Sequence, residues 1–332
     1  MAESVRIARM GSFYAGGRQV RIEGEPVRDI AFTRTASLTY DPNGLYHFEQ
    51  AYVQYFVPET LVSPLPLVLL HGGGFTGAMW ETTPDGRPGW LQIFLELGFA
   101  VYVVDNVERG RAGWCPFPQV WPGEPIIRTA EEVWSLFRFG SAANFSSREP
   151  FPELQFPVSA LDELIKGCVP RWQTNNDAAV ETFRSVLDQV GKCVVVTHSH
   201  GGEIAFRAAE QCPELVPKII AVEPSGFAQR LGAYKGRDVL ILMGDFLEAT
   251  PLWIQLTNKV QDFSRLLEDA GCAVDLLFLK DLNIRGNSHM MMMDTNNQWI
   301  AETVAKWIRR EEDTQGKYSK RRHSTTVARP VE

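Results

Sequence analysis

The stretch Cys193-Val-Val-Val-Thr-His-Ser-His-Gly-Gly202 decides the fold of this chain. Its apolar, mostly β-branched half predicts a buried strand that ends abruptly before Ser199. A helical pattern begins at Glu203, so Ser199 stands at the tip of a strand–turn–helix unit. This is the context of a nucleophile elbow, in which a serine takes a strained backbone conformation between small neighbours. Gly201 supplies one small neighbour, whereas Thr197 stands where a glycine is usual.

A second apolar strand, residues 65–71, runs into the glycine-rich segment His71-Gly-Gly-Gly74. This pattern matches the loop that forms the oxyanion hole of lipases and esterases. Glycine lets the backbone approach a substrate oxygen closely. We therefore expect the backbone N–H groups of Gly73, Gly74 and His200 to bind an oxyanion. A phosphate-binding loop is the alternative, but the Lys-Ser/Thr ending of such a loop does not follow these glycines.

His289 is the candidate base. It lies in Gly286-Asn-Ser-His-Met290, near the C-terminus and before the last expected helix. It follows Ser199 in the chain, as the order serine, acid, histidine requires. A single histidine is more often structural, but together with the elbow and the glycine loop it predicts a serine hydrolase. Three other histidines compete for the role of base: His71, His198 and His200.

The composition is that of an ordinary globular protein. The chain has 332 residues, 45% of them hydrophobic, and a formal net charge of −7, which gives no reason to expect nucleic-acid binding. No apolar run reaches the roughly 18 residues of a membrane helix. The N-terminus lacks the apolar core of a signal peptide, so we expect a cytoplasmic protein. The five cysteines form no CxxC pair, which predicts free, buried thiols and no metal site.

Strand and helix patterns alternate from Pro66 onward, which predicts a mostly parallel sheet with helices on both faces. The expected strands are 65–71, 99–105, 192–198, 218–223, 238–244 and 274–280, and the expected helices are 86–97, 178–190, 203–211, 257–270 and 294–310. Ligands of such sheets bind at the carboxyl ends of the strands. Five candidate site residues lie at or near such ends: His71, Ser199, Glu223, Asp245 and His289.

The segments outside this alternating pattern have separate expected roles. Residues 1–60 are expected to form antiparallel strands at its edge, with a turn at Ala15-Gly-Gly17. Residues 107–177, rich in proline and aromatic residues, are an insertion that we expect to cover the site as a lid; a structural subdomain is the alternative. Residues 1–310 then form one domain. The polar tail 311–332 is expected to be disordered, although its basic cluster is also compatible with a targeting or docking patch. Met290 to Met293 are expected to pack around the His289 loop.

These motifs make the chain resemble an α/β-hydrolase and, more narrowly, a small group of bacterial esterases with a Ser-His-Glu triad. The similarity covers residues 11–307, and the blocks Trp80–Arg87 and Gly286–Met292 carry it most specifically. It implies an esterase with Ser199 as nucleophile, His289 as base and Glu223 as acid. Two adjacent cysteines follow His-Gly in that group, where this chain has Gly73-Gly74. The loop is therefore expected to be more flexible and free of redox chemistry.

Two carboxylates compete for the role of acid. In most enzymes of this fold the acid follows the strand after the sixth, which here is residues 239–243 and selects Asp245. Glu223 instead ends the apolar strand 218–222, where an unpaired buried charge is costly. Pairing with a histidine that becomes cationic during turnover gives Glu223 a reason to be there. We therefore favour Glu223 and expect Asp245 to fix its loop.

The sequence thus predicts an enzyme that hydrolyses small-molecule carboxylic esters through an acyl-enzyme intermediate. This chemistry needs neither a metal nor an organic cofactor, and no nucleic-acid or membrane partner is expected. Two alternatives remain open. One is a thioesterase or lactonase that acts on a specific metabolite. The other is a binding or regulatory protein that keeps the fold as a scaffold.

Overall fold

A central sheet of eight strands organises residues 4–310, the part of the chain that the computed structural model describes. Its strands are β1 (Ile7–Ile22), β4 (Gly44–Pro58), β5 (Leu67–Leu70), β6 (Val101–Asp105), β7 (Val194–His198), β8 (Lys218–Val222), β9 (Asp238–Met243) and β10 (Ala273–Phe278). They lie in the order β1-β4-β6-β5-β7-β8-β9-β10. β4 pairs antiparallel with β1 and β6, and the strands from β6 to β10 are parallel. The mostly parallel sheet predicted from the sequence is confirmed.

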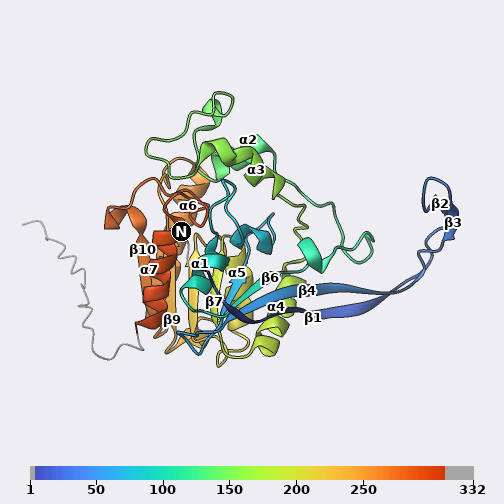
Figure 1. Ribbon diagram of the computed structural model, residues 1–332, viewed down its shortest axis with the longest axis horizontal. Coiled ribbons are helices and arrows are strands. Elements are labelled where there is room, and N and C mark those ends of the chain that lie inside the picture. The colour runs from blue at the N-terminus through green and yellow to red at the C-terminus, as the bar shows by residue number, and fades with distance from the viewer. Residues whose placement is uncertain (1–3, 311–332) are drawn as a thin grey trace, which may run out of the picture.

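Helices cover both faces of this sheet (Figure 1). One face carries α4 (Asn176–Val190), α5 (Gly201–Ala209) and α6 (Pro251–Asp269), and the other carries α1 (Trp90–Glu96) and α7 (Asn297–Arg309). Because side chains alternate along a strand, Val68 packs on the first face and Leu69 on the second. α6 starts at Pro251 rather than at position 257, because the Thr250 side chain accepts the Trp253 N–H and caps the helix.

β1 and β4 form a long antiparallel hairpin that extends away from the body of the molecule (Figure 1). At its tip lies a second, two-stranded sheet of β2 (Arg28–Ala31) and β3 (Ser37–Tyr40). The predicted antiparallel edge is confirmed, but the predicted turn at 15–17 is wrong. β1 runs through it, with Gly16 and Gly17 at φ 63° and 83°. The strand passes α4 closely here, since a Cβ on Gly16 would lie 2.9 Å from Thr182 Oγ1.

The insertion 107–177 contains α2 (Ala130–Leu136) and α3 (Leu161–Lys166) and lies over the carboxyl ends of the parallel strands (Figure 1). Its two arms pair with each other, because the N–H groups of Ile126 and Arg171 donate to each other's carbonyl oxygens at 2.8 and 2.9 Å. Val169 N–H then donates to Gly74 O at 2.8 Å. The insertion is therefore tied to the glycine loop. Part of its aromatic content is internal packing, as with the stacked rings of Phe139 and Phe156.

The structure also bears on the expectations for the cysteines, the methionine run, membrane helices and the tail. The five cysteines carry free thiols, and all except the half-buried Cys168 are buried. Met290 to Met293 are buried in the core beside α7, as expected. Within residues 4–310 no helix is long and apolar enough to cross a membrane. The prediction of a disordered polar tail falls on residues 311–332, which lie outside the described part of the chain.

Candidate active site

Ser199 stands at the tip of a sharp turn between β7 and α5. Its φ of 52° lies in the left-handed region, which residues other than glycine rarely adopt. The turn is held by the Ser199 carbonyl, which accepts the N–H groups of Gly202 at 2.9 Å and Ser225 at 3.1 Å. A Cβ on Gly201 would lie 2.4 Å from His71 O, so only glycine fits there. The geometry is that of a nucleophile elbow.

Thr197 occupies the elbow position where a glycine is usual. It is fully buried, and its hydroxyl has no hydrogen-bond partner in the described structure. A Cβ on Gly201 would lie 2.7 Å from Thr197 Oγ1. The elbow therefore accommodates the larger residue because Gly201, on the other side of the turn, leaves room for it.

The glycine loop lies directly against this elbow. A Cβ on Gly73 would be 3.2 Å from the Cβ of His200, which means that the two backbones approach each other closely. Neither the Gly73 N–H nor the His200 N–H has a hydrogen-bond partner within residues 4–310. Gly74, at φ 78°, borders the same pocket and is held through its carbonyl by Val169. Two free donors thus lie side by side next to Ser199, as an oxyanion hole requires.

His71 holds the start of the glycine loop. Its Nε2 accepts the N–H of Asn106 at 3.2 Å, so Nδ1 carries the proton and donates to Gly72 O at 2.9 Å. Burial lowers the pKa of His71 to about 4, which keeps the ring neutral. Both ring nitrogens of His71 are therefore engaged in holding the backbone.

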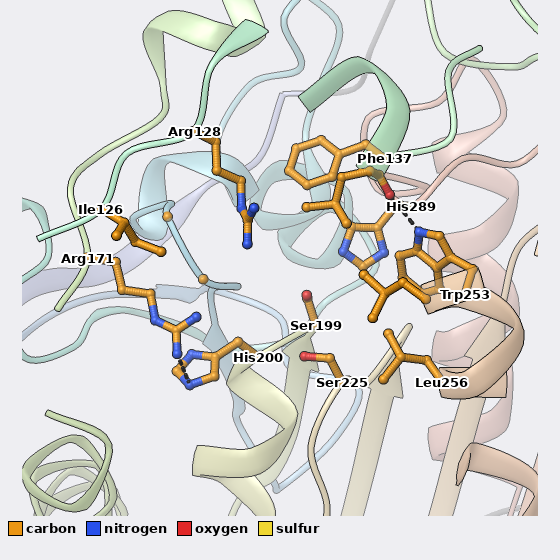
Figure 2. A pocket seen from close by; sticks show the side chains of 14 residues that line it. Ile126, Arg128, Phe137, Arg171, Ser199, His200, Ser225, Trp253, Leu256 and His289 are labelled. Carbon is orange, nitrogen blue, oxygen red and sulfur yellow. Dashed lines mark hydrogen bonds between the residues drawn. The ribbon is translucent and has the colours of Figure 1, made fainter. Parts of the chain in front are cut away.

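His289 faces the same pocket as Ser199 (Figure 2). Its Nδ1 lies 3.3 Å from Glu223 Oε2, and its ring packs against Trp253 at a centroid distance of 4.7 Å. Its backbone N–H donates to Phe137 O, so the insertion helps to position it. Burial lowers the pKa of His289, and the hydrogen bond to Glu223 only partly opposes this shift.

Glu223 directly follows β8 and has a φ of 50°. Its carboxylate is fully buried and accepts two hydrogen bonds from Arg138, at 2.7 and 2.9 Å, and a third from Gly244 N–H. Burial alone would raise the pKa of Glu223, but Arg138 and His289 outweigh it and lower that pKa to about 2. Glu223 is therefore ionised beside His289.

Asp245 does not reach a histidine. Its carboxylate accepts the N–H groups of Phe246 at 3.0 Å and Gly286 at 3.1 Å, and its carbonyl accepts Nε–H of Arg138. It therefore joins the loop after β9 to the loop that carries His289. The arrangement agrees with the expectation that Asp245 fixes its loop while Glu223 meets His289.

The remaining two histidines are engaged elsewhere. His198 lies beneath His289 and donates from Nε2 to His289 O at 2.9 Å. His200 Nε2 lies 2.9 Å from Arg171 Nη2 and must accept from it, because a guanidinium can only donate. Burial lowers the pKa of both rings well below the usual histidine value. His198 thus supports the His289 backbone, and His200 bonds to the insertion.

Sequence reasoning missed the groups that support these residues. Arg138 was visible only as an arginine between two phenylalanines in the insertion. Its guanidinium lies 4.0 Å from the Trp253 ring as well as against Glu223. Asp294, also fully buried, holds the His289 loop by accepting the N–H and hydroxyl of Ser288. Burial raises the pKa of Asp294 to about 6.

Ser199, His200 and His289 border a pocket of about 250 Å³ (Figure 2). Residues from the glycine loop, elbow, insertion, α6 and His289 loop line it. The insertion supplies part of the pocket wall: Ile126, Arg128, Leu136, Phe137 and Arg171. No group of histidine, cysteine and acidic residues in the described chain is arranged to hold a metal ion.

Comparison with known proteins assigns the chain to a family. Residues 67–315 match the model of the alpha/beta hydrolase family, and the chain therefore belongs to that family. It is 31% identical to a bacterial esterase of known structure, covering 93% of this chain and 98% of that one, with a TM-score of 0.80. It is 29% identical to a probable secreted lipase, phiG, of a fungal species (strain ATCC 74256), over 81% of this chain and 88% of that protein. The family and these relatives make this chain a hydrolase.

Proposed function

We propose that this protein is a serine hydrolase that cleaves carboxylic esters through an acyl-enzyme intermediate. One observation carries the proposal: Ser199, His289 and the free N–H groups of Gly73 and His200 border one pocket, with Glu223 bonded to His289. The relatives support the choice of bond, because an esterase and a lipase both cleave esters.

In the first half of the reaction Ser199 Oγ attacks the ester carbonyl carbon, and His289 Nε2 takes the hydroxyl proton. The carbonyl oxygen becomes an oxyanion that the N–H groups of Gly73 and His200 bind. Collapse of this intermediate breaks the bond to the alcohol oxygen. The imidazolium returns its proton to that oxygen, and the free alcohol leaves.

In the second half water attacks the acyl-enzyme. His289 takes a proton from the water, a second oxyanion forms, and the bond to Ser199 Oγ breaks as the serine regains a proton. Glu223 accepts Nδ1–H of His289 in both halves, which fixes the ring and stabilises its charged form. Arg138 keeps Glu223 ionised, so the acid carries its charge before the reaction begins.

A fluorophosphonate probe and p-nitrophenyl butanoate test the proposal together. The wild-type protein should become labelled and should hydrolyse the ester. Ser199→Ala should lose the label and lower kcat by a factor of roughly 10⁶ with the fold retained. Ser225→Ala is the matched control, because Ser225 lines the same pocket and should leave the label in place. Labelling that persists in Ser199→Ala would refute the assignment, and a wild-type protein without label would favour a non-catalytic scaffold.

Acyl thioesters and lactones tested beside the p-nitrophenyl esters will separate esterase activity from the thioesterase and lactonase alternatives.

The cytoplasmic location stays a prediction, because the name of the fungal relative describes that protein as secreted. Fractionation of cells that express the chain, followed by immunoblotting, measures it directly.

A further inference from the structure

The pocket around Ser199 has two chemically different sides (Figure 2). One side is built of aromatic and aliphatic carbon, and the other carries two guanidinium groups and a neutral histidine. Phe137, Trp253 and Leu256 lie on the apolar side, and Arg128, Arg171 and His200 lie on the cationic side together with the aliphatic Ile126. A substrate that extends to both sides of Ser199 therefore meets hydrocarbon at one end and positive charge at the other.

Arg171 is a partly buried cation without a counter-ion. No carboxylate lies within ion-pair distance of its guanidinium in residues 4–310. Its Nη2 donates to His200 at 2.9 Å, and its Nε is buried without a hydrogen-bond partner. Burial lowers the pKa of Arg171, which means that the site penalises the charge that it holds. A charge in this position is costly unless something neutralises it.

Arg128 brings a second positive charge to the same side. Its ion pair with Glu132 joins two side chains that are 34% and 49% exposed, so the pair contributes little and leaves donors free for the pocket. After burial, the nearby charges of Arg109 and then Arg128 further lower the pKa of Arg171, as expected for like charges close together. Backbone pairing of Ile126 with Arg171 fixes the spacing of the two arginines, because Arg128 follows Ile126 by two residues.

The buried acid Glu108 makes no direct ion pair with Arg171. Glu108 accepts hydrogen bonds from its neighbour Arg109, from Trp172 N–H and from Asn175. Its ion pair with Arg109 is 2.9 Å long, and both side chains are 4% exposed. Glu108 thus pairs directly with Arg109, and Glu203 pairs with Arg207 at 3.4 Å. Both acids favour the charge of Arg171 without contacting it, so its guanidinium still has donors for an anion that enters the pocket.

From these contacts we propose that the substrate is an ester that also carries a carboxylate. The carboxylate binds Arg171 and Arg128, and an apolar group of the same molecule packs against Phe137, Trp253 and Leu256. Guanidinium groups match the planar carboxylate well, because they offer pairs of parallel donors. The assignment rests on the proposed ester hydrolysis at Ser199 and narrows its substrate class.

Two matched pairs of esters test this inference. One pair carries the charge on the acyl side: p-nitrophenyl hemiglutarate against p-nitrophenyl glutaramate. The other carries it on the alcohol side: p-carboxyphenyl butanoate against p-carbamoylphenyl butanoate. In one pair at least, wild-type kcat/KM, corrected for spontaneous hydrolysis, should be higher for the anionic ester. Arg171→Gln and Arg128→Gln should each lower the anionic-to-neutral ratio by about 10- to 100-fold, the scale of a hydrogen bond to a charged group.

Arg148→Gln is the matched control. Arg148 lies in the same insertion, is 37% exposed and pairs with Asp162, but it does not line the pocket. Its substitution should keep the anionic-to-neutral ratio unchanged. Arg171→Lys, which keeps the charge without the planar fork, should give an intermediate ratio and serves if the Gln variant does not fold. An equal loss of ratio in Arg148→Gln, or a wild-type preference for the neutral ester in both pairs, would overturn the inference.

Failure of the inference and failure of the proposed function give different results. If neutral esters are hydrolysed without any preference for charge, ester hydrolysis stands and the anion site is wrong. If no ester is cleaved and the fluorophosphonate does not label Ser199, the proposed function is wrong.

Calorimetric titration of the protein with glutarate and with glutaramate then tests the anion site alone. Glutarate should bind more tightly, and Arg171→Gln should abolish the difference; equal binding of the two would exclude the site.

Discussion

Glu223 carries its charge in the protein interior, and Arg138 makes this possible. Both side chains are fully buried, and two hydrogen bonds join them. Removing one partner of such a pair leaves an uncompensated buried charge. Arg138→Met should therefore lower the free energy of unfolding by about 3–5 kcal/mol, measured by urea denaturation. Arg148→Met, which breaks the exposed pair with Asp162, should cost less than about 1 kcal/mol.

A double variant checks the cause of that loss. Arg138→Met combined with Glu223→Gln removes both charges, so it should recover part of the stability that Arg138→Met alone loses. If the double variant is no more stable than the single one, lost packing against Trp253 rather than the unpaired charge explains the effect.

Which carboxylate serves as the acid is tested by replacing each with its amide. Glu223 lies against His289, whereas the carboxylate of Asp245 accepts hydrogen bonds from the backbone N–H groups of Phe246 and Gly286. Glu223→Gln should thus lower kcat by roughly 10⁴, the scale seen when a triad carboxylate becomes an amide. Asp245→Asn should keep substantial activity. The reverse ranking, in variants whose circular dichroism is that of the wild type, would make Asp245 the acid.

The pH dependence follows from the environment of His289. The base must be neutral to accept a proton, and burial lowers the pKa of His289 below the usual 6.5. The ring therefore stays neutral to lower pH, so the acidic limb of kcat/KM should have its midpoint below 6.5. Asp294→Asn is the control, because burial raises the pKa of Asp294 to about 6. If this substitution moves the limb, Asp294 rather than His289 sets it.

Local patterns made some of these residues predictable and others not. Ser199 and His289 stand in short, recognisable contexts, a strand–turn–helix unit and a distinctive loop. The choice between Glu223 and Asp245 depends on which strand end faces His289, and only weak arguments from burial and resemblance favoured Glu223. Arg138 was not foreseen, because it pairs with a carboxylate 85 positions away and nothing in its own neighbourhood indicates that partner.

At the scale of elements, the glycine loop and the elbow depend on each other. A Cβ on Gly73 would lie 3.1 Å from Arg171 Nη1 and 3.2 Å from His200 Cβ. Gly73→Ala should push the loop away from the elbow and separate the two proposed oxyanion donors, the N–H groups of Gly73 and His200. We expect kcat to fall by roughly 10²–10³, the loss seen when one such donor is removed.

Gly232→Ala provides the comparison for this prediction, because no heavy atom lies within 4 Å of the added Cβ. Its kcat should equal that of the wild type. If Gly73→Ala also keeps full activity, the oxyanion donors do not include the N–H group of Gly73.

Elements with a clear hydrophobic pattern were predicted well. Segments whose conformation depends on contacts with distant parts of the chain were not. The apolar runs of the parallel strands indicated their positions to within a few residues. Gly16 and Gly17 suggested a turn by themselves, but in the sheet they let a continuous strand bend past α4. The backbone course of the insertion could not be predicted from local patterns. It depends on hydrogen bonds between residues far apart in the chain, such as that from Val169 N–H to Gly74 O.

At the scale of the whole molecule, the sheet explains why residues far apart in the chain meet. Ser199 and Glu223 follow the ends of β7 and β8, which are neighbours in register, with His198 opposite Val222. The alternation of strand and helix patterns predicts this convergence, because the carboxyl ends of parallel strands lie at one edge of the sheet. The insertion then closes the same end of the sheet and supplies both arginines of the pocket.

The left-handed backbone conformation of Ser199 lowers thermal stability, although the proposed function needs a serine at this position. At φ 52° a residue with a side chain is less stable by about 1–2 kcal/mol, whereas glycine is not. Ser199→Gly should therefore melt at a higher temperature than Ser199→Ala in differential scanning calorimetry, although both lack ester turnover. Equal melting temperatures would show that the turn imposes no such penalty. If the difference is found, selection for activity has held this protein below the thermal tolerance that its own architecture allows.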